Sequence, residues 1–145
     1  MPMYTCTSPA GTLDERQKGA IATAITEIHH QATGAPRSFV DIIFYEVAPG
    51  DTFRGGDREP VSFINGNIRA GRPQAVVQGM LVDIDNAWRQ IVGKSTGNLF
   101  IHMLEIPSKS LMENGHLGVE PGSPVEKRIA AEEEQARRAE PVRRP

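Results

Sequence analysis

The order of strand-like and helix-like segments repeats once along the chain, and this repeat limits the fold more than any other feature. Residues 2–7 and 38–48 read as strands on either side of a helix that ends near residue 32. Residues 61–68 and 99–106 flank a second helix that starts at Pro73. With right-handed crossovers between parallel strands, both helices lie on one face of the sheet. The sequence therefore predicts an α+β fold, a duplicated β-α-β unit whose four-stranded sheet carries two helices on one face.

The expected helices have local start and stop signals. Thr12 and Glu15 match a capping box, and Gly34 suits the end of the first helix. Pro73 suits the first turn of the second helix, and Gly93 ends it. Apolar residues recur at helical spacing in both segments: Leu13, Ala20, Ile21, Ala24, Ile25 and Ile28 in the first, and Val77, Leu81, Ile84, Trp88 and Ile91 in the second.

Two of the strands, residues 38–48 and 99–106, are apolar on both faces in the middle. This pattern is typical of buried strands rather than one-sided edge strands. Two helices cover one face of the sheet and leave the other without cover, so we expect the chain to self-associate.

The 145-residue length suits one domain followed by a tail, and we place the domain at residues 1–118 and the tail at 119–145. Residues 126–138 are nearly all charged or alanine, without an apolar stripe. We expect a frayed, solvated helix or disorder there, and the nearly balanced charges assign the tail no partner.

Charge and composition exclude several classes of function. A net charge of −2 disfavours nucleic-acid binding, and no apolar run approaches the length that spans a bilayer. The start lacks a signal peptide, and the single cysteine, Cys6, fits a reducing cytoplasm as a buried structural thiol. The residues from Gly93 to Thr96 are similar to the end of a phosphate-binding loop. They follow a helix instead of a strand and lack the upstream glycine, so they do not indicate a phosphate site. We expect a cytoplasmic protein with no cofactor and no metal.

Pro2 is the first candidate for chemistry. Removal of Met1 would leave Pro2 with a free secondary amine, and an α-amino group has a reference pKa of about 7.7–8. Desolvation or nearby positive charge can keep such an amine neutral near pH 7, where it is a good general base. A second-position proline by itself usually has no function.

Other polar residues lie where they could bind or polarise a substrate. Arg69 and Arg72 occupy a glycine turn before a helix, an arrangement suited to a carboxylate, although two solvated loop arginines are equally consistent. His29 borders the apolar stripe of the first helix, where a half-buried histidine is favoured by the helix dipole. His102 alternates within a strand as a core histidine would, and Glu113 follows two apolar residues in an expected loop.

Taken together and in order, these residues resemble the tautomerase superfamily, specifically its cis-3-chloroacrylic acid dehalogenase branch. The matching segments are the Pro2 strand, AITEIHHQATG, INGNIRAGRP and EIPSKSLMENG, which ends at Glu113. The resemblance covers residues 2 to about 115 and implies a homotrimer whose sheets line the interface.

The resemblance also implies roles for single residues. Pro2 exchanges a proton with a substrate carbon, and His29, Arg69 and Arg72 hold and polarise the carboxylate end. Glu113 positions or activates water in hydrating members. His102 stands where the dehalogenases have a tyrosine that assists this glutamate, a departure that affects water chemistry more than tautomerisation.

Three functions are consistent with these residues. The leading hypothesis is a tautomerase acting on a small enol or keto acid, with a small carboxylate as its substrate. The second is a hydratase or dehalogenase of an unsaturated three-carbon acid, with water oriented by Glu113 and His102. The third is a non-catalytic oligomeric binding protein on the same scaffold, although a scaffold needs neither Pro2 nor the polar residues.

Overall fold

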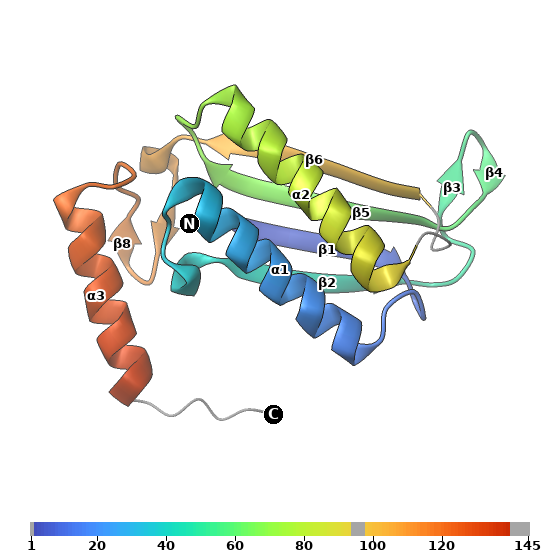
Figure 1. Ribbon diagram of the computed structural model, residues 1–145, viewed down its shortest axis with the longest axis horizontal. Helices are drawn as coiled ribbons and strands as arrows, with labels where there is room; N and C mark the ends of the chain where they lie inside the picture. Colours follow the sequence, from blue (N-terminus) through green and yellow to red (C-terminus); the bar gives the residue numbers. More distant parts are fainter. Residues whose placement is uncertain (1, 94–97, 140–145) are drawn as a thin grey trace.

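The computed structural model describes residues 2–93 and 98–139, and within them two long helices lie on one face of a four-stranded sheet (Figure 1). The helices are α1, Glu15–Thr33, and α2, Gln74–Val92, and they pack side by side across the strands. The predicted α+β fold with a duplicated β-α-β unit is therefore confirmed. The segment from Gly93 to Thr96 that is similar to the end of a phosphate-binding loop falls partly on residues 94–97, which lie outside the described residues.

The sheet joins the two halves through their first strands. Its order is β2-β1-β5-β6, with parallel pairing within each half and antiparallel pairing between β1 and β5. The antiparallel register places Met3 opposite Asn67, so the start of β1 lies beside the end of β5. The strands are β1, Met3–Pro9; β2, Asp41–Val47; β5, Val61–Arg69; and β6, Asn98–Ile106.

The hydrophobic core lies between the helices and the sheet, where the apolar stripes of α1 and α2 meet alternate residues of β1 and β5. The Cys6 thiol belongs to this core, and burial raises its pKa to about 12. The thiol is therefore protonated at neutral pH and acts as a small apolar group. The main core members are Tyr4, Cys6, Ile21, Ile25, Ile64, Ile68, Met80, Ile84 and Trp88.

The start of α1 differs from the expected capping box. The cap is Asp14, whose side chain accepts a hydrogen bond from the Gln17 amide at 2.7 Å. The Gln17 side chain in turn accepts from the Asp14 amide at 2.9 Å. Thr12 is held in a preceding turn, where its amide donates to the Pro9 carbonyl. The capping box thus begins two residues later than predicted, because Asp14 and Gln17 fit the same pattern of residue types.

The face of the sheet opposite the helices is open in the single chain. The predictions that residues 38–48 and 99–106 form strands buried on both faces are therefore wrong for the single chain. β2 and β6 are the two edge strands, and residues that point away from the helices are exposed. We call this surface the open face. Its exposed apolar residues are Met3, Ile43, Tyr45, Phe63, Phe100 and Leu104.

The segment after β6 packs at the end of the sheet where β1 begins (Figure 1). It forms a hairpin of β7, Met112–Glu113, and β8, His116–Leu117, followed by α3, Pro124–Ala139. The tail is thus helical over these residues, and its buried Glu126 was not expected from a solvated helix. A second hairpin, β3, Phe53–Arg54, with β4, Asp57–Arg58, lies at the opposite end of the sheet.

Within residues 2–93 and 98–139, no helix combines the length and apolarity that a membrane span needs.

Candidate functional site

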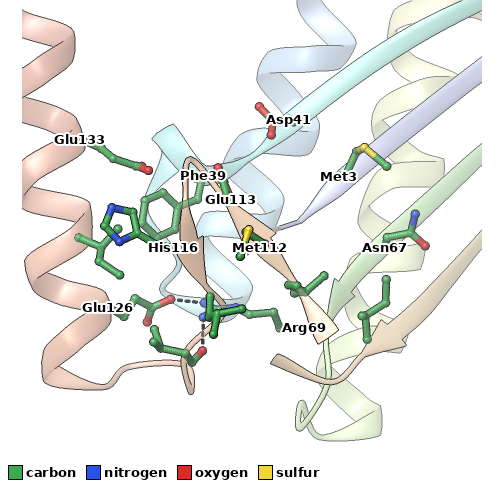
Figure 2. Close-up of a pocket in the computed structure, with 16 residues that line it drawn as sticks. Met3, Phe39, Asp41, Asn67, Arg69, Met112, Glu113, His116, Glu126 and Glu133 are labelled. Atoms are coloured by element: carbon green, nitrogen blue, oxygen red, sulfur yellow. Dashed lines mark hydrogen bonds and ion pairs between the residues drawn. The ribbon is translucent and has the colours of Figure 1, made fainter. Parts of the chain in front are cut away.

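A cavity of about 270 Å³ lies at the end of the sheet where the hairpin and α3 pack. Its walls come from the start of β1, the ends of β5 and β6, the hairpin and the inner side of α3 (Figure 2). Most of the lining is apolar, with charged groups gathered near Arg69 and Glu113. The apolar lining residues are Met3, Phe39, Ile106, Leu111, Met112, Leu117, Val119 and Ile129.

Arg69 ends β5 and lines this cavity, although its side chain is only 5% exposed. Its Nη1 donates to the carbonyl of Val119 at 2.9 Å, and its Nη2 donates to the carboxylate of Glu126 (Figure 2). Glu126 also accepts from the amide of Gly122. The guanidinium is therefore held by the segment that leads into α3.

Arg72 lies in the turn between β5 and α2, and its Nη1 donates to the carbonyl of Thr33 at 3.1 Å. The turn is fixed by the Glu105 carboxylate, which accepts from the amides of Gly71 and Arg72 at 3.2 and 3.3 Å. The Nε of Arg72 is buried and has no hydrogen-bond acceptor among the described residues. A buried donor without a partner is uncommon, so this atom is suited to bind an anion.

His29 is buried at the end of α1, and its Nδ1 lies 2.8 Å from the hydroxyl of Tyr4. The pKa of His29 is lowered to about 4, chiefly by burial and also by the cations Arg72 and Arg69. Burial outweighs the favourable helix dipole that we expected, so His29 is neutral at pH 7 and offers a hydrogen bond rather than a charge. Gly66 makes room for this pair, since a Cβ there would lie 2.8 Å from the Tyr4 ring.

Glu113 lines the cavity from the hairpin, opposite His116 in the register of β7 and β8. The pKa of Glu113 is raised to about 7, chiefly by burial and also by the carboxylates of Asp41 and Glu133. Its Oε2 is buried without a hydrogen-bond partner in the described part of the chain. A carboxyl group poised near neutral pH can take or give a proton.

Pro2 is fully buried and directly precedes Met3, which lines the cavity. Its carbonyl accepts from the amide of Asp41, another lining residue, at 3.1 Å. Arg69 and Glu113 thus face the cavity, whereas Pro2, His29 and Arg72 are not among its lining residues. Met1 lies outside the described residues, so the expected removal of Met1 remains a prediction.

His102 is the one candidate that the structure does not bring to this end of the sheet. It lies in the middle of β6, paired with Asn65, and its ring centroid is 5.8 Å from that of Phe100. Phe100 is exposed on the open face, and His102, two residues further along the strand, shares that face. It is partly exposed there rather than a core histidine.

Several titratable residues at the cavity were not expected: Asp41, His116, Glu126 and Glu133. Glu126 had one usable signal, because Ser123 and Glu126 match the capping-box pattern, and the Glu126 amide does donate to the Ser123 hydroxyl. That pattern indicates a helix start but not a buried ion pair. Among the described residues, no three His, Cys, Asp or Glu side chains group so as to hold a metal ion.

Comparison with known proteins gives a consistent result. A family model described as "Putative oxalocrotonate tautomerase enzyme" matches residues 1–134, which include most of α3. None of the curated proteins matches the chain. The native Ps01740 crystal structure is 38% identical, covering 77% of this chain and 99% of that chain, with a TM-score of 0.74.

Two further structures are similar. N1, a member of the cis-3-chloroacrylic acid dehalogenase family, is 26% identical, covering 92% of this chain and 99% of that chain, with a TM-score of 0.82. Native fused 4-OT is 17% identical, covering 79% and 94%, with a TM-score of 0.71, and shares the fold. The chain therefore belongs to the oxalocrotonate tautomerase-like family that this model describes, and to the cis-3-chloroacrylic acid dehalogenase-like branch of the tautomerase superfamily.

Proposed function

We propose that the protein is a tautomerase that uses Pro2, exposed as an N-terminal amine after removal of Met1, on a small enol or keto acid. The main observation is that Pro2 is buried directly before β1. Its neighbour Met3 lines the apolar cavity, as does Asp41, whose amide donates to the Pro2 carbonyl. Arg69 lies at the same cavity and supplies the charge that a carboxylate needs. Both family and fold support this chemistry.

In this mechanism the neutral Pro2 amine takes the proton from the enol hydroxyl and returns it to the carbon of the enol double bond that does not bear the oxygen, which leaves the ketone. Burial of Pro2 favours the neutral amine. Negative charge that develops on the enolate is stabilised by the guanidinium groups, and the neutral His29 can donate a hydrogen bond. Positioned proton transfer contributes about 10²–10⁴-fold to such a rate, and charge stabilisation adds to it.

A hydratase or dehalogenase acting on a three-carbon unsaturated acid is the second candidate. The pKa of Glu113, raised to about 7 by burial, favours it, because such a carboxyl group can activate water near neutral pH. His102 is not among the residues that line the cavity, so in this proposal it would assist from another subunit. We therefore rank this activity below tautomerisation.

A non-catalytic binding protein is the third candidate. The pKa of Glu113, raised to about 7, speaks against it, because binding alone needs no carboxyl group that can take or give a proton near neutral pH. We also propose a homotrimer, because the open face exposes a set of large apolar residues and the fold neighbours include a fused 4-OT symmetric trimer.

The first experiment determines the mature N-terminus by mass spectrometry and then assays ketonisation of phenylenolpyruvate. We expect Pro2→Ala, which replaces the rigid secondary amine, to lower kcat/KM about tenfold or more. Pro49→Ala, at an exposed turn far from the cavity, is the matched control and should leave the rate unchanged. Wild-type turnover by Pro2→Ala, or by a form that retains Met1, would exclude the proline mechanism.

A further inference from the structure

Arg69 faces the cavity, yet its guanidinium already has a carboxylate partner from the same chain. Both of its terminal nitrogens donate to the segment that leads into α3, one to the Val119 carbonyl and one to Glu126 (Figure 2). The side chains of Arg69 and Glu126 are only 5% and 9% exposed. An incoming carboxylate therefore meets an ion pair, not a free guanidinium.

The other charged groups at the cavity make this point stronger. Asp41 and Glu133 also line it, so with Glu126 in place three acidic side chains accompany the single guanidinium of Arg69. Glu113 adds to this repulsion whenever it is ionised. A carboxylate would enter this arrangement against repulsion unless Glu126 moved away from Arg69.

We propose that Glu126 is an internal carboxylate ligand of Arg69, which the substrate carboxylate displaces when it binds. Glu126 thereby sets the affinity and specificity of the site. This inference rests on the proposed function for its substrate, an enol acid, but concerns a residue outside the duplicated β-α-β unit. The exchange keeps the buried guanidinium paired throughout, so neither state leaves Arg69 without a counter-charge.

Glu126 is attached in a way that allows this exchange. It belongs to the first turn of α3, and the contacts of its carboxylate are with Arg69 and with the amide of Gly122, four residues earlier. When Glu126 leaves, the Gly122 amide can bind water, since Gly122 is exposed. The cost of release is therefore confined to one turn of the chain.

The exchange also defines the substrate class. Replacing one carboxylate by another on Arg69 yields little net affinity, so binding must come from the remainder of the ligand. The cavity offers apolar walls, including Phe39, Leu111 and Ile129, to that remainder. The site should therefore prefer monocarboxylic enol acids with an aryl or alkyl body over three-carbon acids.

Calorimetric titration with phenylacetate, a carboxylate that cannot react, tests the displacement. In Glu126→Gln the competing charge is gone, and we expect the Kd to fall about tenfold. Glu133→Gln is the matched control, because it removes the same charge from the same helix and cavity without touching Arg69. It should change Kd by less than about threefold. An unchanged or weaker affinity in Glu126→Gln, or equal gains in both variants, would overturn the proposal.

Acetate serves as the second probe and tests the substrate class. Phenylacetate should bind wild-type protein at least about tenfold more tightly than acetate, since the ring fills the apolar cavity. Equal affinities would exclude the preference for an apolar body.

Hydrogen exchange of the wild-type protein covers the case in which Glu126→Gln fails to fold. Saturating phenylacetate should speed exchange of the Gly122 amide, which loses its carboxylate acceptor. Unchanged or slower exchange would contradict displacement.

Two outcomes separate this inference from the proposed function. If Glu126→Gln binds phenylacetate more tightly but the wild-type protein does not turn over phenylenolpyruvate, the inference stands and the tautomerase is refuted. If the wild-type protein turns over phenylenolpyruvate and Glu126→Gln leaves the KM unchanged, the tautomerase stands and the inference is refuted.

Discussion

Glu113 shows how burial of one carboxyl group changes both stability and chemistry. Its folded-state pKa is raised from 4.5 to about 7, so between these values the folded protein binds more protons than the unfolded chain. The free energy of unfolding should therefore fall as pH rises from about 4.5 to 7. Urea denaturation at several pH values should show this slope in wild type and a flatter one in Glu113→Gln.

The same variant separates the two candidate reactions. Activation of water needs ionised Glu113, so any hydration of cis-3-chloroacrylate should rise with pH through about 7 and disappear in Glu113→Gln. Ketonisation involves no water and should persist. Glu132→Gln, an exposed carboxylate on α3, is the control for both measurements. Dehalogenation that does not respond to Glu113→Gln would remove its assigned role.

Residue types and their order predicted the candidate residues but not the state of each. The order of Pro2, His29, Arg69, Arg72 and Glu113 pointed to one superfamily, which the family model confirms. The neutral state of His29 depends on burial beside two arginines that are distant in the sequence. Such an environment is a property of the tertiary structure and has no local signal.

At the scale of elements, periodicity predicted the four long strands and both long helices, because each buries one continuous apolar stripe or row. The hairpin of β7 and β8 was missed, since each of its strands has two residues and shows no alternation. The role of α3 was missed for a different reason. Its contacts with the site include a buried ion pair, from Glu126 to Arg69, and a hydrogen bond, from Asn114 to Glu133, and such polar contacts leave no apolar stripe in the sequence.

Gly118 fixes the hairpin against the preceding turn, and its substitution is a prediction at this scale. A Cβ at Gly118 would lie 2.1 Å from the Ser108 carbonyl oxygen, and the Gly118 amide donates to Leu111 at 2.8 Å. Gly118→Ala must therefore move the hairpin, and we expect it to lower the free energy of unfolding by about 1–3 kcal/mol. It should also raise the KM for phenylenolpyruvate, because the hairpin forms a cavity wall.

The matched control for Gly118→Ala is the same substitution in α2. A Cβ at Gly79 meets no atom within 4 Å, and the position is exposed within the helix. Gly79→Ala should raise the free energy of unfolding by about 0.5–1 kcal/mol, because alanine loses less entropy than glycine in a helix. If denaturation curves of the two variants shift in the same direction, the contact with Ser108 does not constrain the hairpin.

At the scale of the whole molecule, the two faces of the sheet differ in how far the single chain covers them. α1 and α2 cover one face, whereas the open face exposes large side chains such as Tyr45, at 55%, and Phe100, at 54%. The apolar patterns of β2 and β6 predict buried strands. A second and third copy packed on this face would reconcile the pattern with the fold.

The proposed trimer can be tested by placing a charge on the open face. Phe100 packs against Phe63 and His102 there, and glutamate at this exposed position costs an isolated chain little. Within an interface the same charge is buried without a partner, so Phe100→Glu should dissociate the assembly. Sedimentation should then show monomers, while Val82→Glu, at an equally exposed position on α2, should stay trimeric. A wild-type monomer, or a trimeric Phe100→Glu, would refute assembly through this face. Full ketonisation activity in the monomer would show that no residue of a neighbouring subunit, His102 included, takes part in the reaction.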